Sequence, residues 1–143
     1  MNSNRDNPRV GREFEALTAK VLGRHFGVEF ELGVAIPIGY PAKDHKFDCV
    51  SVDERIVAEC KCFTWTNTGN VPSAKMGFVN QAVFYLSFLP DGIKRVIVMK
   101  KATHRKRTET LAEYYCRTYI HLLQGVSLLE LDAENEVIIT IKE

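Results

Sequence analysis

A pair of apolar runs around a short polar link constrains the fold more than any other sequence feature, and it predicts a central β-hairpin. Residues 47–52 and 55–63 are rich in β-branched and other apolar side chains. The link between the two runs consists of Asp53 and Glu54. Asp-Glu is a poor sequence for a tight two-residue turn, so we expect a wider loop.

This hairpin gathers charged side chains at one end of an otherwise apolar sheet. If the strands are symmetric about the link, Asp48 lies opposite Glu59, and Lys61 shares their face. Opposed carboxylates repel each other, and burial makes their charge costly. Either Lys61 or a divalent cation with oxygen ligands should compensate. The alternative is a surface ion pair of Lys61 with Glu59 or Asp48 on an exposed edge.

The rest of the hairpin is expected to be core on both faces, which makes the strand central rather than an edge. One face carries Val50, Val52 and Val57, and the other carries Phe47, Cys49, Ile56, Ala58, Cys60 and Cys62. Two carboxylates and a lysine beside a metal ion suit phosphodiester hydrolysis, because the metal polarises the phosphate and lowers the pKa of bound water.

Periodicity elsewhere predicts a mixed sheet with helices on its faces, an α/β architecture. We expect helices over 12–25, 74–88 (capped by Ser73) and 111–118, the last with a capping box of Thr110 and Glu113. Expected strands are 28–38, the two hairpin runs, 95–99, 119–123 and 137–141, and 126–131 is ambiguous. Residues 1–10 are expected to be flexible. Loops are expected over 43–46 and 66–72.

Composition sets wider limits. The 143 residues fit one domain, and no apolar run reaches the length of a membrane-spanning helix. The polar N-terminus is unlike a secretory signal, and the four cysteines form no CxxC pair, so reduced thiols in the cytoplasm are expected. The four histidines show no metal or catalytic-triad spacing and are interpreted as incidental. A net charge of +1 points to no partner.

A family resemblance follows from the order of these motifs. The pattern D-x10-E-x-K on a hairpin, after the helix GREFEALTAKVLGRHFG, resembles the PD-(D/E)XK nuclease superfamily, and the Mrr-like restriction endonuclease branch in particular. The run AEYYCRTYIHLLQGVSLLEL is similar to the end of that domain. The resemblance covers residues 11–132. Departures are Phe47, where proline is common, and the absence of a glycine-rich approach over 43–46.

The resemblance implies a restriction-endonuclease-like core with αβββαβ order and a Mg²⁺- or Mn²⁺-dependent endonuclease that acts on DNA. It makes Asp48 and Glu59 the metal carboxylates, Lys61 the catalytic lysine and the Cys60 carbonyl a further ligand. By its FE pair, it makes Glu15 the glutamate of the first helix. Periodicity alone leaves Glu13 and Glu15 open, since both flank the apolar stripe, and either could simply be a first-turn glutamate.

Two further features bear on nucleic acid. Gln81 and Tyr85, four apart on the second helix, resemble the QxxxY element of the RecB-type nucleases; the alternative is a buried tyrosine beside a glutamine. A basic stretch follows the central strand and includes Lys100, Lys101 and Arg105, which could contact phosphates. The alternative there is a solvated loop.

The leading hypothesis is a metal-dependent deoxyribonuclease. A Holliday-junction resolvase-like enzyme, a nucleic-acid-binding protein with a vestigial site, and a plain structural α/β domain are the alternatives. A homodimer is expected, with the aromatic helix 74–88 as the contact, because that helix is apolar on nearly all sides. A partner subunit could supply specificity, since the sequence does not identify the type of DNA.

Overall fold

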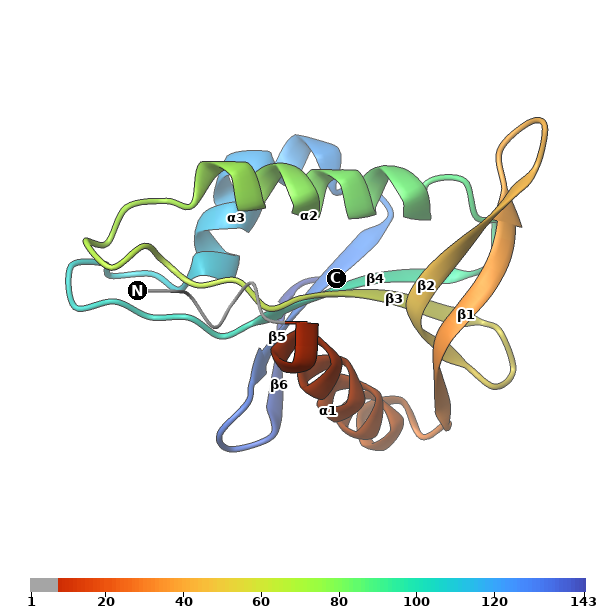
Figure 1. Ribbon diagram of the computed structural model, residues 1–143, viewed down its shortest axis with the longest axis horizontal. Helices are drawn as coiled ribbons and strands as arrows, with labels where there is room; N and C mark the ends of the chain where they lie inside the picture. The colour runs from red at the N-terminus through yellow and green to blue at the C-terminus, as the bar shows by residue number, and fades with distance from the viewer. Residues whose placement is uncertain (1–7) are drawn as a thin grey trace.

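The computed structural model describes residues 8–143, which form an α/β fold of one six-stranded mixed sheet and three α-helices (Figure 1). The elements are α1 (Pro8–Phe26), β1 (Phe30–Ile38), β2 (Lys43–Ser51), β3 (Ile56–Lys61), α2 (Ser73–Leu86), β4 (Lys94–Lys100), α3 (Leu111–Tyr119), a 3₁₀ turn (Ile120–Leu122), β5 (Val126–Asp132) and β6 (Val137–Lys142). Among the described residues, no helix has both the length and the apolar character that a membrane span requires.

The spatial order of the strands follows the chain, from β1 to β6. The three middle strands, β3, β4 and β5, run parallel, and an antiparallel hairpin closes each edge of the sheet. Parallel neighbours need long crossover connections, and α2 and α3 supply them. Both crossover helices lie on one face of the sheet, and α1 lies on the other (Figure 1).

Each face of the sheet therefore has its own apolar cluster. The cluster under α2 and α3 includes Leu86, Ile97 and Tyr115, and the one under α1 includes Leu22 and Val98. The apolar run of β4 contributes to both, as its continuous hydrophobic sequence predicts for a strand covered on two faces. This arrangement makes β3 and β4 the rigid centre from which the candidate site projects.

The predicted hairpin register is confirmed. Cys49 pairs with Ala58 and Val50 with Val57, which puts the symmetry point between Asp53 and Glu54. The link is wider than two residues, as expected, because β2 ends at Ser51 and β3 begins at Ile56. Hydrogen bonds from the Ser51 hydroxyl to Asp53 and from the backbone of Ile56 to that hydroxyl order this turn.

Two core assignments in the hairpin are wrong. Val52 is 49% exposed, because it lies in the turn rather than on the strand. Phe47 packs in the α2 cluster with Val50 rather than with Cys49 under α1. Strict alternation fails there because β1 and β2 twist strongly away from the plane of β3 and β4 (Figure 1).

Several element boundaries differ from the predictions. Residues 1–7 lie outside the described part of the chain, and α1 already begins at Pro8, which is well suited to a helix start. The predicted loop 43–46 belongs to β2, because β1 is long enough to pair with it as far as Lys43. Residues 119–123 form the end of α3 and a 3₁₀ turn instead of a strand.

The helix caps give one confirmation and one error. Thr110 and Glu113 form the predicted reciprocal capping box at the start of α3. Ser73 is the first residue of α2, not its cap, and Pro72 precedes it without a side-chain hydrogen bond.

The ambiguous segment 126–131 is β5, which is buried along almost its whole length between two strands.

Candidate active site

Asp48 and Glu59 lie at the point where β2 and β3 separate. Backbone pairing between these strands ends at Cys49 and Ala58. Beyond that pair, the two carboxylates accept the hydrogen bonds that link the strands. Glu59 Oε1 accepts a hydrogen bond from the backbone N–H of Asp48 at 3.0 Å, and Asp48 Oδ2 accepts one from the N–H of Cys60 at 2.8 Å. The predicted cross-strand proximity of the two acids is therefore confirmed.

Glu59 is only 5% exposed, which is unusual for a carboxylate. Burial and, second to it, the neighbouring Asp48 charge raise the pKa of Glu59 to about 8. The N–H of Asp48 and the Lys61 charge act in the opposite direction but do not offset the burial. A proton or a cation at this position would relieve the repulsion.

His45 is a member of the site that sequence reasoning missed. Its Nε2 lies 3.3 Å from Glu59 Oε2, and its ring stacks on Tyr85 with centroids 3.9 Å apart. Burial lowers the pKa of His45, which favours the neutral ring. No sequence signal identified it, because it lies three positions before Asp48 and regular alternation would place the two on opposite faces.

Lys61 ends β3, two residues beyond Glu59. Within residues 8–143, its ammonium makes no ion pair or hydrogen bond, so the alternative of a Lys61 surface ion pair with Glu59 or Asp48 is wrong. Its charge nevertheless lowers the pKa of both Glu59 and Glu15, and Lys61 lines the same cavity as Glu15. A cation held in this way is available to an anionic ligand.

Glu15, rather than Glu13, faces the site. Burial raises the pKa of Glu15, and the Asp48 charge is the next largest cause. The Glu13 side chain is 68% exposed and lies 3.9 Å from Arg9, one turn earlier on α1. The structure thus places Glu15, and not Glu13, in the cavity wall with Lys61.

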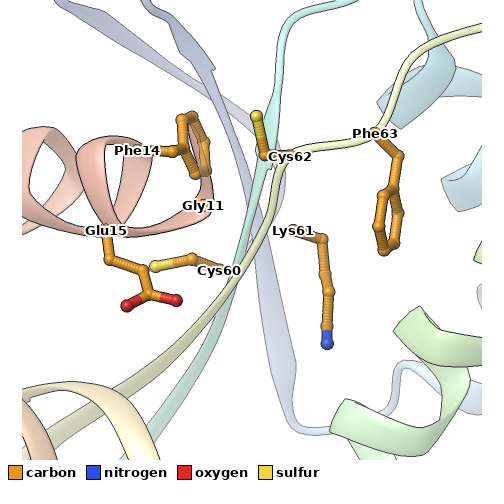
Figure 2. A pocket seen from close by; sticks show the side chains of 7 residues that line it. All are labelled: Gly11, Phe14, Glu15, Cys60, Lys61, Cys62 and Phe63. Atoms are coloured by element: carbon orange, nitrogen blue, oxygen red, sulfur yellow. The ribbon is translucent and has the colours of Figure 1, made fainter. Parts of the chain in front are cut away.

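A cavity of about 150 Å³ lies between α1 and the end of β3, with Glu15 and Lys61 both in its wall (Figure 2). Figure 2 shows the Cys60 side chain turned towards α1 while Lys61 extends the other way. The Cys60 thiol lies 3.7 Å from Cys49 Sγ, and Cys60 is also one of the residues that line the cavity. The remaining wall residues are Gly11, Phe14, Cys62 and Phe63.

Gln81 and Tyr85 lie on α2, above the site. Tyr85 is half-buried on His45, and Gln81, one turn earlier, is exposed. The pair therefore borders the site through His45, and Gln81 is not part of a buried tyrosine cluster. One side of α2 is not covered by the described residues, because Phe78, Phe84 and Phe88 are substantially exposed.

The basic stretch divides into structural and accessible members. Arg107 packs on the Trp65 ring and donates to the carbonyl of Gly69, so its charge is engaged within the fold. Lys101 and Arg105 are exposed, and Lys100 is half-buried at the end of β4. The loops after β3 and β4 lie side by side, joined by hydrogen bonds that include Trp65 Nε1 to the Ala102 carbonyl at 3.0 Å.

The donor set suits a hard divalent cation, although it is not preformed. Within residues 8–143, no group of three or more His, Cys, Asp or Glu side chains is arranged so that it could hold a metal ion as it stands. Glu15, Asp48 and Glu59 offer carboxylate oxygens, the ligands that Mg²⁺ and Mn²⁺ prefer. A carboxylate oxygen that accepts one N–H keeps a lone pair, so the hydrogen bonds of Asp48 and Glu59 do not exhaust their capacity.

Comparison of the chain with models of protein families, with curated proteins and with solved structures found no match. The resemblance to the PD-(D/E)XK superfamily therefore stays a prediction, and a functional conclusion depends on the geometry of the site.

Proposed function

We propose that this protein is a metal-dependent deoxyribonuclease with a restriction-endonuclease-like αβββαβ core. The observation that carries the proposal is the convergence of Glu15, Asp48 and Glu59 where β2 and β3 separate, beside Lys61, which is unpaired within the described residues. Three acids in partly buried positions destabilise one another, and a fold keeps such an arrangement most readily where a cation is bound.

Asp48, Glu59 and Glu15 would hold Mg²⁺ or Mn²⁺, with the Cys60 carbonyl as a further ligand. When bound, the metal would polarise the scissile phosphate and lower the pKa of a bound water. At least one carboxylate must turn for this, since no three ligands are yet grouped in the described chain. His45 would hold Oε2 of Glu59 by a hydrogen bond while Oε1 turns towards the cation.

Lys61 would act on the attacking water and on the phosphate, not on the metal. Its free ammonium can align the attacking water and stabilise negative charge that develops on the phosphate. Placement at the end of β3 limits its movement, because the backbone there pairs with Met99 of β4. Lys100, Lys101 and Arg105, together with Gln81 and Tyr85, would contact the DNA around the cut.

A homodimer is proposed for cutting both strands, with the exposed Phe84 and Phe88 on α2 as the contact. A partner subunit remains the proposed source of sequence specificity. A Holliday-junction resolvase-like activity and a vestigial, binding-only site are the competing proposals.

The test is a cleavage assay with Mg²⁺ and with Mn²⁺ on linear, methylated and branched DNA. We expect the wild-type chain to cut at least one of these substrates and Glu59→Gln to cut none, since the amide cannot supply the charge that a divalent ion needs. Cleavage of branched DNA alone would favour the resolvase-like activity. Binding without cleavage on the whole panel would favour the vestigial site.

A further inference from the structure

We propose that Phe63 and Phe78 form a stacking platform for an unpaired base beside the candidate active site. The substrate class would then be DNA that contains a single-stranded segment, such as a flap, a fork or a free strand. This inference rests on the proposed function, because it concerns the substrate of that same site.

The platform adjoins the catalytic lysine directly. Phe63 follows Lys61 by two residues and forms part of the wall of the same cavity (Figure 2). Its ring centroid lies 6.4 Å from that of Phe78 on α2, at an angle of 44°. Phe78 is 47% exposed, so packing in the core uses only part of its surface. The two rings thus extend the floor of the site from β3 to α2.

A positive charge accompanies the rings. The Lys75 ammonium lies 5.5 Å from the Phe63 centroid and 5.8 Å from that of Phe78. Together with Lys61, it gives the platform the charge that complements a phosphate backbone. Single-strand sites in proteins combine these same two features, a basic track along the backbone and aromatic rings for the bases.

One stripe of α2 continues the platform towards the acids. Phe78, Gln81 and Tyr85 are three and four residues apart, so they lie along one side of the helix. The stripe begins at Phe78, which packs on Phe63, and ends where Tyr85 stacks on His45, the hydrogen-bonding partner of Glu59. A strand laid along it would place bases on Phe78 and its backbone near Lys61.

Stacking selects unpaired bases for a geometric reason. In a duplex each base is covered on both faces by its neighbours, so a ring beside the scissile phosphate has no base face to contact. In a single strand the face is accessible, and every base has one, so the recognition is independent of sequence. A surface that served only duplex DNA would need the basic groups without the rings.

The test compares binding of a labelled single strand of about 20 nucleotides with that of a duplex of equal length. Fluorescence anisotropy in EDTA keeps cleavage out of the measurement. We expect Phe78→Leu to weaken single-strand binding about 10-fold and to change duplex binding little. Tyr40→Leu is the control, because Tyr40 is a fully exposed aromatic side chain in the turn between β1 and β2, outside both the stripe and the proposed dimer contact. It should bind both probes as the wild type does.

Phe78→Trp protects the test against a folding defect, since a larger ring should keep or strengthen single-strand binding. The proposal is overturned if the wild type does not prefer the single strand, or if Phe78→Leu weakens both probes equally. It is also overturned if sedimentation shows that Phe78→Leu dissociates a dimer, because the rings would then contact a second copy. Because no metal is present, these outcomes are independent of whether the site cuts DNA.

Discussion

Asp48 and Glu59 each bind the strand on which the other lies: Glu59 accepts from the Asp48 N–H, and Asp48 accepts from the N–H that follows Glu59. The two carboxylates thereby replace ladder bonds where β2 and β3 separate. This exchange holds the two carboxyl groups side by side through hydrogen bonds from backbone N–H groups. It explains how the fold can retain the acids before any cation binds.

Asp48→Asn tests whether Asp48 serves metal binding or the fold. Asparagine can still accept the Cys60 N–H through its side-chain oxygen, while the repulsion with Glu59 disappears. In EDTA, thermal unfolding should show equal stability or a gain of up to about 1 kcal/mol. We expect Mg²⁺ to raise the melting temperature of the wild type and to leave that of the variant unchanged.

Asp48→Ala is the control, because it removes the acceptor as well as the charge. It should destabilise the fold by about 1–3 kcal/mol, since the Cys60 N–H loses its partner. If Asp48→Asn is as unstable as Asp48→Ala in EDTA, the charge of Asp48 is structural and the proposed metal role loses its support.

The raised pKa of Glu59 predicts a pH dependence of stability in metal-free buffer. The folded carboxyl has a pKa of about 8 and the unfolded one a pKa near 4.5, so the folded state holds more protons between these values. The contribution of Glu59 to the free energy of unfolding should be largest below about pH 4.5. It should fall as the pH rises to about 8. Each unit of pKa elevation corresponds to about 1.4 kcal/mol.

Glu59→Gln supplies the comparison for this curve. The amide does not titrate, and it can still accept the N–H of Asp48. Chemical denaturation between pH 5 and pH 8 should therefore give a flatter dependence for the variant than for the wild type. Parallel curves would mean that Glu59 is ionised throughout and that its environment is more polar than the burial indicates.

The two glutamates of α1 should behave differently in the cleavage assay. Glu15 borders Asp48 and Lys61, so Glu15→Gln should lower turnover by about 10–100-fold. Glu13 forms an exposed pair with Arg9, and such pairs contribute little, so Glu13→Gln should match the wild type in both rate and stability. A loss of activity in Glu13→Gln alone would reverse the assignment.

The hairpin could be predicted from the sequence because its physics is local. The apolar runs and the link between them determine which residues oppose each other, and the observed register of Cys49 with Ala58 follows from that symmetry. The capping box of Thr110 and Glu113 was predictable for the same reason, since it involves only four consecutive residues. The hairpin register and the capping box could each be predicted without knowledge of the rest of the fold.

Twist and tertiary contacts explain what could not be predicted. His45 reaches Glu59 only because β2 extends past the expected loop and curls under α2, and the sequence 43–46 has no strand signal of its own. The choice between Glu13 and Glu15 depends on the direction in which α1 packs on the sheet. Residues 119–123 show strand-like composition, but they lie at the end of α3 and the turn that follows it.

Lys61→Ala and Lys101→Ala give the sharpest test of the proposed mechanism, because they should affect different steps. If Lys61 acts on charge that develops at the phosphate, its loss should lower the cleavage rate by about 100-fold or more. Affinity for DNA should change much less, since one lysine is a small part of a surface that contacts many phosphates. Unfolding of the protein should be unaffected, because Lys61 pairs with no group in residues 8–143.

Lys101 is exposed beyond the end of β4, so Lys101→Ala should show the reverse pattern. We expect weaker binding, a shallower dependence of affinity on salt concentration, and a near-normal rate at saturating DNA. Single-turnover cleavage with Mn²⁺ separates the two effects, since it measures the chemical step apart from binding. Lys61→Ala cleaving as fast as the wild type would remove the role assigned to Lys61, and with it the mechanistic meaning of the E-x-K pattern in this chain. A rate loss shared equally by both variants would instead indicate that Lys61 contributes only to the general attraction of DNA.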